Sequence, residues 1–80
     1  MPDRAIEVGH LAEADRHIAD GRLRIAEMEA LVAETETAGE DATAGKQSLL
    51  SMRETLVQFE QHRTEILQTI SDIDAGKFAG

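Results

Sequence analysis

The sequence predicts an all-α protein, an antiparallel hairpin of two helices that dimerises into a four-helix bundle. Apolar residues recur at the a and d positions of a heptad in both halves of the chain, which is typical of two packed helices. A short stretch containing Gly39 and Asp41 separates the two halves and predicts a turn at about residues 39–41. A second stripe of small and apolar residues, which one neighbouring helix cannot cover, predicts the dimer.

The first helix is expected over about residues 5–38. Asp3 is suited to the N-cap, and Gly39 is suited to the left-handed position that follows a helix end. The seam positions recur every seven residues through four heptads. The a row is Leu11, Ile18, Ile25 and Val32, and the d row is Ala14, Gly21, Met28 and Thr35.

The second helix is expected over about residues 42–74. Asp41 is the predicted N-cap, with Thr43 as the alternative, and Gly76 ends the helix. Residues 75–80 are predicted to form a loose tail. Arg63 is the one charged residue in an otherwise apolar seam. The two rows are Leu49, Leu56, Arg63 and Ile70, and Met52, Phe59, Ile66 and Ile73.

Charged residues beside the seam predict the register of the two helices. Three pairs of opposite charge fall together in one antiparallel register. They are Glu36 with Lys46, Glu29 with Arg53, and Arg22 with Glu60. The same register is expected to place Ile25 against Phe59 and Gly21 against Arg63.

Composition excludes several classes of function. The chain has 80 residues, so it forms one small domain, and without cysteine it has neither a disulfide nor a thiolate metal site. Its formal net charge of −8 disfavours binding to nucleic acids and to anionic membranes. Without a basic apolar leader or a long apolar run, we expect a cytoplasmic protein. The stretch between Gly39 and Lys46 does not match a phosphate-binding loop, because its spacing and its acidic residues are wrong.

A second stripe of residues predicts where the dimer forms. Alanines recur every seven residues along the first helix, and small residues allow a second helix to approach closely. The other interpretation is that alanine simply favours a helical surface. The second helix carries leucine and valine in the matching row, and two further leucines lie on other faces of the first helix. The expected interface residues are Ala12, Ala19, Ala26, Ala33, Leu23, Leu31, Leu50 and Val57.

One stripe of potential metal ligands lies on the first helix. His10, Glu13 and His17 are spaced so that they share a helix face, and His62 lies on the facing helix. In a chain this rich in charged residues, the stripe is interpreted as a solvated surface. We therefore expect no metal, no cofactor and no catalytic residues.

The chain resembles small uncharacterised helical-hairpin proteins of alphaproteobacteria. The resemblance rests on the run from His10 to Gly21, on the turn from Gly39 to Thr43 and on the pair His62-Arg63, and it covers about residues 10–73. The turn departs from the family's pattern by substitution and spacing. The resemblance implies a helical hairpin of bacterial origin and no known activity.

The predicted function is therefore that of a non-enzymatic structural or protein–protein interaction module that forms a homodimer. One alternative is a small acidic regulatory protein that docks on a larger bacterial partner. The other alternative is a metal-binding bundle that uses the histidines.

Overall fold

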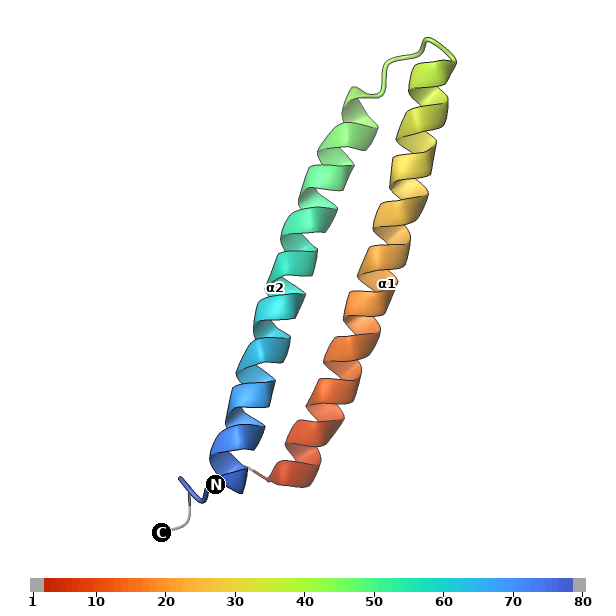
Figure 1. Cartoon of the computed structure of the whole chain (residues 1–80). Helices are drawn as coiled ribbons and strands as arrows, with labels where there is room; N and C mark the ends of the chain where they lie inside the picture. The colour runs from red at the N-terminus through yellow and green to blue at the C-terminus, as the bar shows by residue number, and fades with distance from the viewer. Residues whose placement is uncertain (1–2, 79–80) are drawn as a thin grey trace.

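The computed structural model describes residues 3–78 and shows two long helices side by side (Figure 1). Helix α1 spans Arg4–Thr37 and helix α2 spans Thr43–Asp74. The helices run antiparallel, and the molecule is a rod with principal extents of 64 × 15 × 14 Å. The predicted all-α hairpin is confirmed.

The start of α1 is fixed by the side chain of Asp3. Its carboxylate accepts hydrogen bonds from the backbone N–H groups of Ala5, at 2.8 Å, and Ile6, at 3.4 Å. These N–H groups have no acceptor within the helix, so the side chain satisfies donors that would otherwise face only water. The predicted N-cap is confirmed.

Gly39 ends α1 as predicted. Its φ of 75° lies in the left-handed region, which favours a residue without a side chain. The backbone N–H of Gly39 donates to the carbonyl of Glu36, and the N–H of Glu40 donates to the carbonyl of Thr35, both at 3.0 Å. These bonds close the last turn of the helix and reverse the chain direction.

The start of α2 differs by one residue from the prediction. Ala42, which is buried, occupies the N-cap position and has no side-chain cap. Asp41 supplies the cap instead, because its Oδ1 accepts from the backbone N–H of Thr43 at 2.9 Å and from the Thr43 hydroxyl. These two bonds, the hydroxyl first, lower the pKa of Asp41 below its ordinary value by stabilising the ionised form.

We expect Asp41→Ala to lower the melting temperature at neutral pH and to have less effect in acid. A lowered folded-state pKa contributes stability above the pKa of the unfolded chain, and that stability is lost as pH falls through the folded value. Melting curves by circular dichroism between about pH 7 and pH 2 measure the difference. Asp41→Asn is the matched control, because asparagine caps helices without a titrating charge. A difference in melting temperature between wild type and Asp41→Ala that stays constant with pH would contradict the role of the carboxylate.

The end of α2 is followed by a hydrogen-bonded turn. Gly76 again has a φ of 75°, and the backbone N–H of Lys77 donates to the carbonyl of Asp72 at 3.0 Å. The Lys77 ammonium also lies 3.1 Å from the Asp72 carboxylate. The pKa of Asp72 is lowered by its hydrogen bonds, first from Lys77 and then from Gln68. Residues 75–78 of the predicted loose tail thus form this turn, and residues 79–80 lie outside the described part of the chain.

The core lies in the seam between α1 and α2, where the heptad rows place it. Every residue of the four predicted rows is buried or half-buried. The cluster nearest the turn contains Ile25, Val32, Ala42 and Leu49, with Met28, Met52 and Leu56 packed against it. The heptad rows were therefore assigned correctly.

The seam register is offset from the predicted one. Gly21 faces Leu56, whose Cδ1 lies 3.5 Å from the position that a Cβ on residue 21 would occupy. Gly45 faces Val32. The Arg63 guanidinium pairs with Asp15, so the prediction that Gly21 faces Arg63 is wrong. The error arose because lysine and arginine side chains are long and flexible. The same flanking ion pairs fit two seam registers one heptad, or about 10 Å, apart.

Candidate functional site

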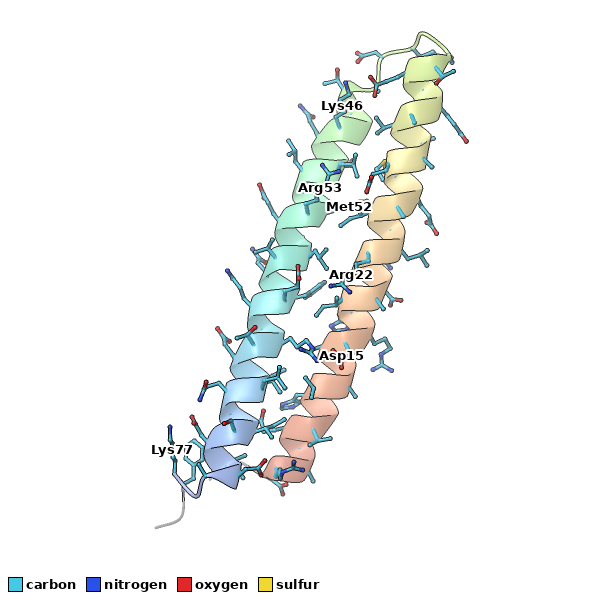
Figure 2. All side chains as sticks on the ribbon, viewed as in Figure 1. Asp15, Arg22, Lys46, Met52, Arg53 and Lys77 are labelled. Atoms are coloured by element: carbon cyan, nitrogen blue, oxygen red, sulfur yellow. The ribbon has the colours of Figure 1, made fainter. Side chains whose placement is uncertain are left out.

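One face of the hairpin is covered by ion pairs that join the two helices, and we call it the ion-pair face (Figure 2). The charged α1 residues that form these pairs recur every seven residues. The three predicted ion pairs are confirmed. The pairs are Asp15 with Arg63, Arg22 with Glu60 at 3.9 Å, Glu29 with Arg53 at 4.0 Å, and Glu36 with Lys46 at 3.4 Å. Arg4 and Asp74 form a further pair at the open end, at 2.8 Å.

These pairs fix the arrangement of the helices more than they stabilise it. The Glu29 and Arg53 side chains are 54% and 53% exposed, and pairs at this exposure each contribute only a few tenths of a kcal/mol. The pairing of Arg63 with Asp15 explains why the seam tolerates a charged residue. The stem of Arg63 lies among the apolar rows, and its guanidinium emerges on the ion-pair face to meet Asp15.

The opposite side of the seam holds a groove of about 350 Å³, and we call this side the groove face. Gly21 opens the groove, because the missing side chain leaves Leu56 uncovered at mid-height of the rod. The floor is apolar and the rim is polar. The lining residues are His17, Asp20, Gly21 and Arg24 of α1, and Ser51, Met52, Thr55, Leu56 and Phe59 of α2.

The groove face differs in its chemistry from the ion-pair face. Among residues 3–78, none of the ion pairs that join α1 to α2 crosses the groove. An aromatic contact between the helices lies here, where the His17 ring is 5.3 Å from the Phe59 ring, centroid to centroid. An apolar floor that no inter-helix ion pair of the described chain covers, with the charged groups Asp20 and Arg24 at its rim, is suited to contact with another apolar surface.

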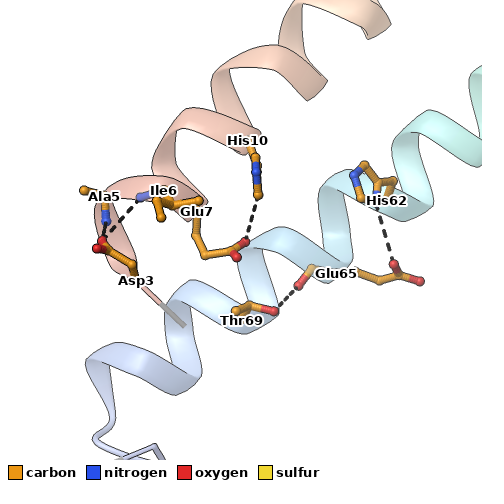
Figure 3. A network of polar contacts seen from close by, with 8 residues as sticks. All are labelled: Asp3, Ala5, Ile6, Glu7, His10, His62, Glu65 and Thr69. Atoms are coloured by element: carbon orange, nitrogen blue, oxygen red, sulfur yellow. Dashed lines mark hydrogen bonds and ion pairs between the residues drawn. The ribbon is translucent and has the colours of Figure 1, made fainter. Parts of the chain in front are cut away.

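The histidines are separated rather than gathered at one site. His10 lies 3.6 Å from Glu7 of its own helix, and His62 lies 3.8 Å from Glu65 of its own helix (Figure 3). The His17 ring lies against the Phe59 ring at an interplanar angle of 37°. Within the described residues, no three His, Asp or Glu side chains are close enough together to hold a metal ion. The predicted candidates His10, Glu13, His17 and His62 are therefore not assembled as a site.

The predicted interface residues are exposed, but they do not form one surface. Ala26 follows Arg22 by four residues, and Leu50 follows Lys46 by four. The alanine row of α1 and the row of Leu50 and Val57 on α2 therefore flank the ion-pair face. Leu31 follows Arg24 by seven residues and lies on the groove face, while Leu23 points away from the seam. The exposed alanines are Ala12, Ala19, Ala26 and Ala33, and the leucines and valine are Leu23 at 60%, Leu31 at 53%, Leu50 at 61% and Val57 at 51% exposure.

Sequence reasoning missed the groove itself. Gly21 was assigned to the seam, but its missing side chain was expected to accommodate Arg63 and not to expose Leu56. A usable signal was present on the second helix, where Ser48, Ser51 and Thr55 are small residues with helical spacing along one face. Such a row beside an apolar seam leaves that side open.

Neither helix within the described chain has a stretch that is long and apolar enough to cross a membrane. No protein-family profile, curated protein or solved structure matches this chain.

Proposed function

We propose that the protein is a non-enzymatic interaction module that works as a homodimer, with two hairpins packed as a four-helix bundle. The observation that supports this proposal is the thinness of the core. The buried apolar side chains of the described chain all lie in the single seam, and none of them is fully enclosed. They are Ala14, Ile18, Ile25, Val32, Ala42, Leu49 and Ile66.

A core of one layer gives a small domain little stability. In chains below about 80 residues a single core supplies little stability, and a disulfide, a metal, association or very regular helix packing often supplements it. This chain has no cysteine, and its large apolar side chains Leu23, Leu31 and Leu50 are each more than half exposed. Packing against a second hairpin would bury part of this surface and add a second layer to the core.

Sedimentation equilibrium at micromolar concentration tests the proposal, and we expect a mass of twice the 8.7 kDa chain. The helical signal in circular dichroism should fall on dilution together with the dimer, since folding and association support each other. A fully helical species that stays monomeric at every concentration would refute the homodimer.

A second candidate function is a small acidic regulator that docks on a larger partner. Leu50 favours it, because this side chain is 61% exposed and flanks the ion-pair face, away from the groove. The sedimentation experiment separates the two functions, because a folded monomer is expected of a docking regulator and excludes the obligate dimer.

A further inference from the structure

We infer that a second copy of the chain docks antiparallel on the groove face, and that Leu31 of each copy fills the groove at Gly21 of the other. This inference rests on the proposed homodimer and assigns its interface. A two-fold axis across the rod, at the height midway between Gly21 and Leu31, makes the two contacts equivalent, as the symmetry of a homodimer requires.

The groove and the side chain that fills it lie on one face. Arg24 lines the groove, and Leu31 follows it by two helical turns, so Leu31 belongs to the same stripe of α1. Leu31 is 53% exposed, and ten residues, or about 15 Å along the helix, separate it from Gly21. A second α1 that runs in the opposite direction therefore brings its own Leu31 over the apolar floor at Leu56.

Charge complementarity supports this register. With Leu31 over Gly21, Arg24 of one copy lies beside Glu27 of the other, and the symmetry repeats that pair. The same alignment places His17 near Glu34 of the other copy. Two hairpins that each carry a net charge of −8 repel one another, so an interface that pairs its few cations with acids is strongly preferred.

The small residues of α2 complete the interface. Gly21 faces Leu56 and Val32 faces Gly45, so the height midway between Gly21 and Leu31 corresponds to Ser51 on α2. The two-fold axis then passes close to Ser51. It sets Ser48 of one copy opposite Thr55 of the other, and small side chains at such a crossing allow two helices to approach closely.

The ion-pair face is the less suitable surface for a second copy. A partner there would have to cover Asp15, Arg22, Glu29 and their α2 partners, whose charges are now hydrated. When paired charges are removed from water, the desolvation penalty exceeds their mutual attraction unless the geometry of the pair is very good. The Arg22 and Arg53 pairs are long, at 3.9 and 4.0 Å, and so fall short of that geometry.

Charge reversal at Arg24 and Glu27 tests the inference. Arg24→Glu and Glu27→Arg should each raise the dimer dissociation constant roughly tenfold or more, because each variant creates two like-charge contacts across the axis. An equimolar mixture of the two variants should regain wild-type affinity, because each interfacial pair is then opposite in sign. Sedimentation equilibrium of the full-length chains measures both effects, and circular dichroism at a concentration high enough for each variant to associate confirms that its helices form.

Arg22→Glu is the matched control, since it makes the same charge change on the ion-pair face and should weaken the dimer far less than Arg24→Glu. If the wild type is a dimer but Arg24→Glu raises the dissociation constant no more than Arg22→Glu does, the assigned interface is wrong and the homodimer stands. Weakened single variants that fail to associate with each other would overturn the Arg24–Glu27 pairing. A wild type that is monomeric refutes the proposed function itself, so the two failures are distinguishable.

Discussion

Ile25→Ala is expected to lower the free energy of unfolding by about 3 kcal/mol. Ile25 is only 8% exposed and belongs to the cluster with Val32 and Leu49 at the turn-proximal end of the seam. Truncation removes apolar contacts and leaves a cavity, and two rigid helices held at many other points cannot close around it. In a domain this small, a loss of that size is a large part of the total stability.

Urea denaturation followed by circular dichroism, at a fixed protein concentration, measures the effect. Leu23→Ala is the matched control, because Leu23 lies on the same helix and is 60% exposed. Its substitution should change the stability by no more than about 0.5 kcal/mol. A cost below about 1 kcal/mol for Ile25→Ala would contradict the burial of this side chain in a tightly packed seam.

Two glycine-to-alanine substitutions are expected to act in opposite directions. Gly45→Ala should lower the free energy of unfolding by about 1–2 kcal/mol, because a Cβ at this position would lie 2.8 Å from Cγ2 of Val32. Val32 is buried and β-branched, so its side chain cannot rotate away easily. The clash therefore outweighs the usual gain in helix propensity.

Gly9→Ala provides the matched control. A Cβ at Gly9 would meet nothing within 4 Å, so only the helix propensity changes, and stability should rise by up to about 1 kcal/mol. Thermal and urea unfolding of the two variants measure the contrast. A stabilising Gly45→Ala would mean that α1 and α2 are farther apart near the turn than the seam geometry requires.

The parts of the fold that follow from local chemistry could be predicted from the sequence. Gly39 and Asp3 mark helix ends because a left-handed backbone and a capping carboxylate are properties of one or two residues. The heptad rows identify the seam because a helix of 3.6 residues per turn presents them on one side. The bounds of α1 and α2 were therefore predicted to within one residue.

The seam register and the groove could not be predicted in the same way. The pairing of Glu29 with Arg53 is compatible with two alignments of the apolar rows, and only side-chain packing distinguishes them. Val32 fits against Gly45 in one alignment, and that contact depends on the distance between the helices, which no heptad pattern specifies. The groove at Gly21 is a consequence of the same alignment, so it was missed for the same reason.

The buried cluster of Ile25, Val32, Ala42 and Leu49 lies beside the turn, and this position has a consequence for the order in which the hairpin assembles. Val32 and Gly45 are close along the chain, so their contact closes a short loop, whereas Arg4 and Asp74 meet only after nearly the whole chain is ordered. The entropy lost on closing a loop grows with its length, and contacts of low sequence separation therefore form fastest. We therefore expect the two helices to pair first beside Gly39 and then progressively toward the open end.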